Sequence, residues 1–171
     1  MSTALPNHYP NHYYDGFEKQ WLEPLEAAAT ASGIDSLLIM RSTPTHMVAV
    51  VSAGPRRDTY HPGDAGPKSV VPGCHKLYCE QVVNDAAPLH VNEARGNLEW
   101  EGNEDLVQFG LGTYLGYPLR GPDGEVLGTL CALHREPFEF DAGQPSLREQ
   151  LEGLRREIED DLAAVAVEAA N

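Results

Sequence analysis

The segment YLGYPLRGPDGEVLGTLCALH, residues 114–134, decides the fold that we expect for this chain. Two apolar runs rich in Leu, Val, Thr and Tyr flank the turn-forming tripeptide Pro122-Asp123-Gly124. Proline presets φ at the first corner of a turn, and glycine accepts the left-handed conformation at its end. The segment therefore predicts a β-hairpin with strands over residues 114–119 and 126–134.

The composition limits the classes of protein that we consider. The chain has 171 residues, 42% hydrophobic and 22% charged, which is typical of one well-packed domain. Its net charge is −14, and no basic cluster exceeds Arg56-Arg57 or Arg155-Arg156, so we expect no nucleic-acid partner. No apolar run could span a bilayer, and the N-terminus lacks a signal-sequence pattern. We therefore expect a cytoplasmic protein with no membrane partner.

The segments before the hairpin predict both helix and sheet. Residues 1–14 indicate an irregular lead-in, and residues 15–171 a single domain. The domain begins with a helix that ends at Gly33. Pro24 either kinks this helix or delays its regular part to about Glu23, because proline removes a hydrogen bond and crowds the preceding turn.

The middle of the chain predicts strands and a long loop. Two runs that are apolar throughout predict strands in a sheet covered on both faces. The loop that follows, residues 54–73, holds four prolines and four glycines, and a loop this long commonly lines a site or is mobile. The expected elements are strands at 36–41, 46–52 and 89–91, a helix at 75–87, a crossover at 95–112 with a short helix at 104–109, and a terminal helix at 146–167 with a capping box of Ser146 and Glu149.

The hairpin pattern Y-x-G-x-P-L, followed by D-G-x-x-L-G-T-L-C, resembles the GAF domain family. Residues 77–94 are also similar to GAF sequences, and the resemblance extends over residues 35–140. It implies an α/β (α+β) fold, with a mixed, mainly antiparallel central sheet flanked by helices. It also implies a role in sensing and signalling through a bound small molecule.

The resemblance further implies where such a molecule binds. Terminal helices pack on one face of the sheet, and the other face encloses a cavity together with the crossover. Aromatic walls supply apolar area there, and a few polar groups orient the ligand. Core packing is the alternative role for Phe109, Tyr114 and Thr129. The expected ligand-binding residues are His90, Trp100, Phe109, Tyr114, Thr129 and Cys131.

The three cysteines offer a different chemistry. Cys74, Cys79 and Cys131 are an odd number, which favours free thiols in an intracellular chain. Cys74 stands at the start of the predicted helix, where a thiol pKa falls, so Cys74 and Cys79 are candidate redox residues. Although His75 and Cys79 are four residues apart, the chain has no CxxC pair, so we expect no metal site.

These observations favour a binding domain over an enzyme. We expect noncovalent sensing of an unknown small molecule, with no further cofactor and no catalytic output. The alternatives are a thiol-based redox enzyme or sensor similar to the free methionine sulfoxide reductases, and a metal-binding sensor. Those reductases have a reactive cysteine in the crossover, and residues 95–112 contain none. The long apolar stripe of the last helix predicts a homodimer through the terminal helices, with output to a separate signalling protein.

Overall fold

The computed structural model describes residues 16–170, with side chains to residue 165, so the lead-in expected over 1–14 lies outside the described residues. The described part folds around a single sheet in the order β3-β2-β1-β6-β5-β4, in which every neighbouring pair is antiparallel. The expected α+β fold is confirmed. The strands are β1 (Ser36–Ser42), β2 (His46–Ala53), β3 (Ala65–Pro67), β4 (Leu89–Val91), β5 (Thr113–Arg120) and β6 (Val126–His134).

The predicted hairpin joins β5 to β6. Tyr117 pairs with Leu130 across it, and Gly124 has a φ of 83° at the turn. A side chain other than glycine is strained at that φ, so the turn chemistry that predicted the hairpin also sets its register. β6 then pairs with β1, which places the hairpin in the middle of the sheet.

Side chains from both faces of β1 are buried, as its apolar sequence predicts. All seven residues of the strand are buried. Leu37 and Ile39 point into one hydrophobic cluster, and Leu38 and Met40 point into the other. Successive side chains of a strand alternate between faces, so this one strand contributes to two separate cores.

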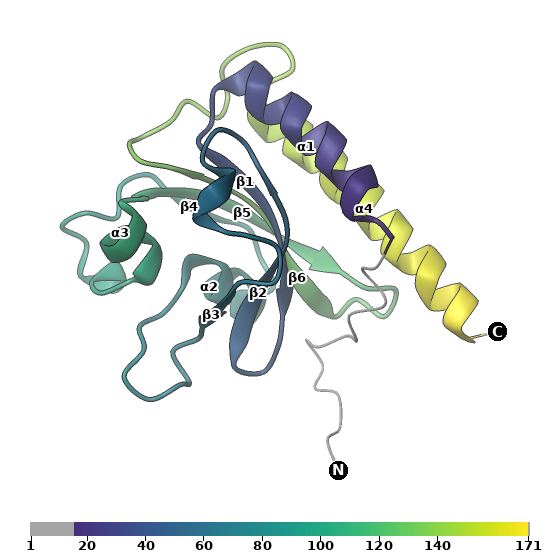
Figure 1. Ribbon diagram of the computed structural model, residues 1–171, viewed down its shortest axis with the longest axis horizontal. Coiled ribbons are helices and arrows are strands. Elements are labelled where there is room, and N and C mark those ends of the chain that lie inside the picture. The colour runs from purple at the N-terminus through teal and green to yellow at the C-terminus, as the bar shows by residue number, and fades with distance from the viewer. Residues whose placement is uncertain (1–15, 171) are drawn as a thin grey trace.

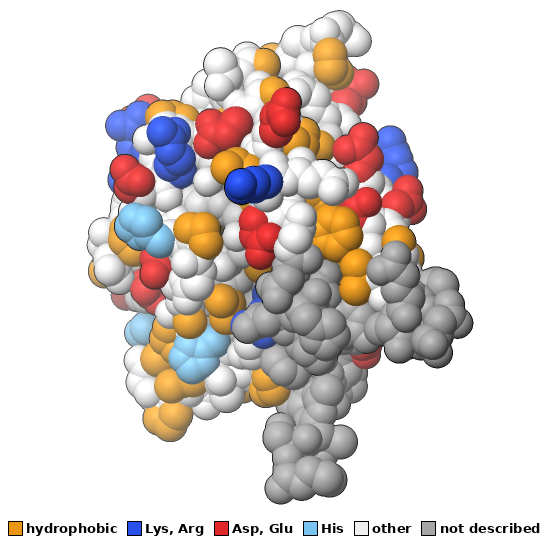
Figure 2. All heavy atoms as spheres, turned by 45° about the vertical axis from the view of Figure 1, so that its right-hand side comes forward, with side chains coloured by type: hydrophobic (Ala, Val, Ile, Leu, Met, Phe, Trp, Pro, Cys, Tyr) orange, Lys and Arg blue, Asp and Glu red, His pale blue; other side chains and the backbone are white. Residues whose placement is uncertain are grey.

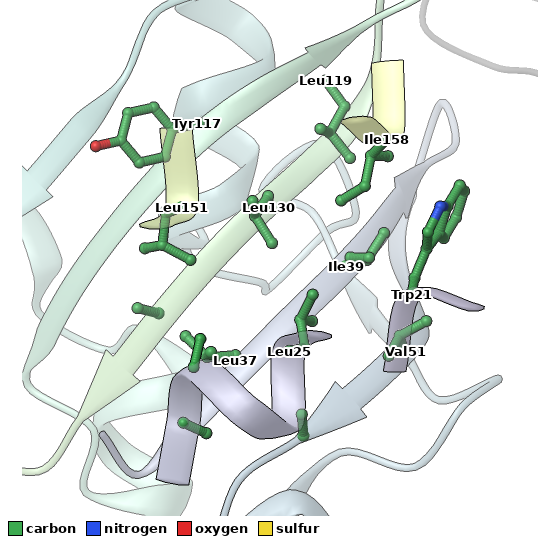
Figure 3. Packing of buried hydrophobic residues seen from close by; sticks show 14 of the residues in the cluster. Trp21, Leu25, Leu37, Ile39, Val51, Tyr117, Leu119, Leu130, Leu151 and Ile158 are labelled. Atoms are coloured by element: carbon green, nitrogen blue, oxygen red, sulfur yellow. The ribbon is translucent and has the colours of Figure 1, made fainter. Parts of the chain in front are cut away.

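The terminal helices cover one face. Helices α1 (Glu18–Ser32) and α4 (Leu147–Ala170) lie side by side over the sheet (Figure 1). Side chains of both helices meet those of β1, β2, β5 and β6 in the first cluster (Figure 3). Helix α1 runs through Pro24 without delaying its start. The capping box is confirmed: Ser146 N–H donates to Glu149 Oε1, and Glu149 N–H donates to Ser146 Oγ.

The other face carries shorter elements. These are the 3-10 helices η2 (Arg57–Thr59) and η3 (Leu98–Trp100), and the α-helices α2 (Tyr78–Asp85) and α3 (Glu104–Phe109). Helix α2 is shorter than the predicted helix over 75–87. It begins at Tyr78 because the Glu80 carboxylate accepts the Leu77 N–H at 3.1 Å and also binds Ser69, which caps the first turn.

Acidic and basic side chains are mixed on the face of the protein shown in Figure 2. Asp and Glu side chains are scattered over the face shown in Figure 2, with Lys and Arg side chains between them. Among residues 16–170, no helix combines the length and the apolar character that a membrane span requires.

Candidate functional site: a cavity beneath a short crossover helix

A cavity of about 220 Å³ lies between the β1–β2 end of the sheet and helix α3. Two kinds of side chain line it, an apolar set and a polar set. The apolar lining is Met40, Met47, Ala65, Gly66, Leu77, Cys79 and Phe109, and the polar lining is Thr59, Tyr60, Asp64, Glu104, Asp105 and Gln108. An apolar pocket with a few convergent polar groups is the usual form of a small-molecule site.

Helix α3 forms one wall and is held at both ends. At its start, the Asn103 side chain accepts the Leu106 N–H at 3.2 Å and donates to the Lys76 carbonyl at 2.7 Å. At its end, Arg56 donates to the Phe109 carbonyl, and Arg95 donates to the Gly110 carbonyl at 2.7 Å. Cations suit a helix C-terminus, where carbonyl groups lack intrahelical partners.

Tyr60 and Asp105 join the loop after β2 to this wall. The Tyr60 hydroxyl donates a short hydrogen bond to Asp105 Oδ1, and the Tyr60 ring packs edge-on against Phe109 with centroids 5.1 Å apart. The pKa of the Asp105 carboxyl is raised to about 6, chiefly by burial; the hydrogen bond from Tyr60 lowers it, and the charge of Glu104 raises it. Burial, followed by the charge of Asp105, raises the pKa of Tyr60, so the hydroxyl keeps its proton.

The structure places one of the six predicted ligand-binding residues, Phe109, on this cavity. Trp100 is buried away from the cavity lining. The centroid of its ring lies 4.9 Å from that of Tyr78, and the Lys76 ammonium lies 4.8 Å from the same Trp100 centroid. His90 lies on the opposite side of the sheet, where its ring contacts Phe140 at 5.3 Å.

The remaining three residues lie inside the protein away from the cavity lining. Tyr114, Thr129 and Cys131 are buried on β5 and β6, and the Tyr114 ring packs 5.1 Å from Tyr78 of α2. Helix α2 fills the space over β5 and β6, so the cavity lies instead over β1 and β2. A role in ligand binding for these residues stays a prediction.

Sequence reasoning did not identify Tyr60, Asp64 or Asp105. The signal available for the first two was the length of the loop over 54–73, which does line the cavity. Asp105 gave no signal, because an acidic residue in the first turn of a helix is ordinary on the surface.

The cysteines are all free, and they differ in environment. Cys79 lines the cavity, and burial raises the pKa of its thiol well above the ordinary value. Burial also raises the pKa of Cys131, to about 12. Cys74 precedes α2 by several residues, so the expectation that it stands at a helix start is wrong. Within residues 16–170, no group of three or more His, Cys, Asp or Glu side chains could hold a metal ion.

A six-stranded antiparallel sheet, with terminal helices on one face and a cavity under a crossover on the other, defines a small α+β domain. The family model of the GAF domain matches residues 23–159. The chain belongs to the GAF domain family. No curated protein matches it.

Solved structures, a GAF domain among them, share the fold at low sequence identity. The GAF domain of Acinetobacter phosphoenolpyruvate-protein phosphotransferase is 15% identical, with a TM-score of 0.60 over 93% of this chain and 87% of its own. Staphylococcus aureus NreA mutated in its nitrate binding site is 15% identical, with a TM-score of 0.55 over 80% of this chain and 97% of its own. The type II free methionine-R-sulfoxide reductase of Thermoplasma acidophilum is 10% identical, with a TM-score of 0.59 over 88% of this chain and 94% of its own.

Proposed function

We propose that this GAF domain senses a small molecule, which binds noncovalently in the cavity beneath α3, and that it catalyses no reaction of its own. The observation that carries the proposal is the cavity of about 220 Å³, which has an apolar floor and a wall of hydrogen-bonding groups. A cavity of about 150 Å³ already admits benzene, so this volume suits a metabolite of modest size.

Strand β1 links the cavity to the terminal helices. Met40 of β1 lines the cavity, while its neighbour Ile39 packs against α1 and α4 on the opposite face (Figure 3). A ligand that touched both Tyr60 and Asp105 would order the loop and α3 together. Output would then pass to the terminal helices and to a separate signalling protein. The apolar stripe of α4 is buried within its own chain as far as Leu162, so a homodimer through these helices stays a prediction.

Thiol redox chemistry is the second candidate, because Cys79 lines the cavity and a methionine sulfoxide reductase shares the fold. Such chemistry needs a thiolate. Burial and the negative charge of Asp105 both oppose ionisation of Cys79, and its pKa is raised accordingly. This environment supports a binding role for the cavity over a reactive cysteine.

Native mass spectrometry of the gently purified full chain tests the proposal. We expect a native mass that exceeds the denatured mass by one small molecule. The excess should disappear in Gly66→Leu, whose side chain fills the cavity. It should persist in Gly66→Ala, because an added Cβ makes ordinary contacts, 3.6 Å from Leu77 and 3.8 Å from Glu104.

An enzyme assay provides the opposing outcome. Equal native and denatured masses, together with thioredoxin-coupled consumption of NADPH on free methionine sulfoxide that Cys79→Ser abolishes, would contradict a purely sensory role.

A further inference from the structure

We infer that the ligand of the cavity beneath α3 is a small organic cation, such as a primary amine, whose charged group binds beside Asp105. This inference rests on the proposed function and adds to it the charge and the chemical class of the ligand.

The charge of the lining is of one sign. Asp64, Glu104 and Asp105 contribute carboxylates, and none of the described residues that line the cavity is Lys, Arg or His. Like charges repel strongly where water is scarce, so an anionic guest is disfavoured at this wall. A cation gains from the same field.

Asp105 lacks a counter-charge within the described protein. Tyr60 donates to one of its carboxylate oxygens, and no other described residue donates to the carboxylate. At neutral pH the carboxyl is ionised, because its pKa of about 6 lies below that pH. A partly buried charge without an ionic partner is destabilised by its lost hydration, so a bound cation would relieve an existing penalty.

The buried lysine on this side of the sheet is already engaged. Lys68 donates to the Ser42 hydroxyl at 2.8 Å and to the Thr43 carbonyl at 2.6 Å. Burial lowers the pKa of its ammonium, and the negative charge of Glu80 opposes this effect. Lys68 therefore does not neutralise Asp105, and the cavity keeps its negative character.

The floor favours an organic cation over a metal ion. Met40 and Met47 from the sheet, and Phe109 from α3 itself, add apolar and aromatic surface to the lining. A cation close to an aromatic ring is itself stabilised by the electrons of the ring face. No group of three or more metal-binding side chains converges anywhere in residues 16–170. A ligand with a short apolar body and a terminal ammonium group would contact the apolar lining and the carboxylates at the same time.

Three ligands of similar size and shape test whether the charge of the ligand decides its affinity. Benzylamine, benzyl alcohol and benzoate share a ring and differ in charge at neutral pH. We would titrate each into the full-length protein by NMR and thermal unfolding. We expect benzylamine to bind about tenfold or more tightly than benzyl alcohol, a difference of about 1.4 kcal/mol, and benzoate to bind less tightly than either.

Two variants with the same change of charge locate the effect. In Asp105→Asn, benzylamine should lose about tenfold in affinity while benzyl alcohol binds as before. In Asp85→Asn, which changes an exposed residue of α2 outside the cavity lining, all three affinities should match those of wild type.

The outcomes distinguish the inference from the function on which it rests. If benzyl alcohol or benzoate binds as tightly as benzylamine, or if Asp105→Asn leaves the benzylamine affinity unchanged, the ligand class is wrong and the sensory proposal stands. If none of the probes gives a saturable response, and the native mass also equals the denatured mass, both are overturned.

Discussion

The phenolic oxygen of Tyr114 lies too close to Gly116 for a Cβ atom to fit at that position. The two residues share one face of β5, and the Tyr114 ring extends along the strand over the glycine. Gly116 is absent from the glycines with positive φ, so the position requires space and not an unusual backbone conformation. This contact gives the Tyr-x-Gly part of the hairpin signature a steric cause.

Gly116→Ala should therefore destabilise the protein. The added methyl group collides with a ring that is itself packed against Tyr78, so it cannot be accommodated without a shift. Overpacking of this kind costs about 1–3 kcal/mol, which chemical denaturation would measure. Tyr114→Phe removes the overlapping oxygen and should recover part of the loss in the double variant. A Gly116→Ala protein as stable as wild type would contradict the steric explanation.

A pair of tyrosines tests the cost of an unpaired hydroxyl. The Tyr114 hydroxyl is buried with no hydrogen bond of normal geometry in the described part of the chain, although the Cys131 thiol, a weak partner, lies near it. The Tyr78 hydroxyl, in contrast, donates to the Leu111 carbonyl at 2.9 Å. Tyr114→Phe should leave the free energy of unfolding unchanged or raise it. Tyr78→Phe should lower it by about 1–2 kcal/mol, because it leaves a buried carbonyl without a donor. Equal losses in the two variants would mean that the Tyr114 hydroxyl also has a partner.

The titration of Asp105 should appear in the pH dependence of stability. Its pKa is raised from 3.8 to about 6 in the folded state, so the folded protein binds this proton more tightly. Protonation of Asp105 therefore stabilises the folded state. This stabilisation is complete below about pH 4, the unfolded pKa, and is lost as the pH rises through 6. Asp105→Asn mimics the protonated form and should therefore gain on the order of 2 kcal/mol over wild type between these limits. Urea denaturation of both proteins across that range measures the gap, and a constant gap would contradict the assignment.

His134 should show the opposite dependence on pH. Its Nδ1 accepts the Asp35 N–H at 3.1 Å, which requires the ring to be unprotonated at that atom. Burial lowers the pKa of His134, and the nearby Asp35 carboxylate offsets this only in part. The neutral His134 ring therefore stabilises the folded state fully above about pH 6.5, the pKa of histidine in the unfolded chain. This stabilisation is lost as the pH falls through the lower pKa that His134 has in the folded protein. NMR titration should give a midpoint below 6.5, and a midpoint above it would show that the ion pair with Asp35 dominates.

The predictions that succeeded from the sequence rest on local chemistry. The hairpin follows from its turn residues, the start of α4 follows from the Ser146 and Glu149 capping box, and the burial of both faces of β1 follows from its apolar run. The limits of α2 were less well predicted, because Glu80 caps the helix through Ser69, a residue in the preceding loop.

The sequence by itself determined the elements and the family, because turns, caps and strand patterns depend on residues within a few positions of one another. Tertiary structure decided where the cavity lies and which groups face it. Tyr60 and Asp105 meet across 45 residues of chain, and α2 occupies the space in which Tyr114 and Cys131 were expected to meet a ligand. A cavity is the volume that packing leaves unfilled, so its position depends on the summed sizes of side chains from distant segments.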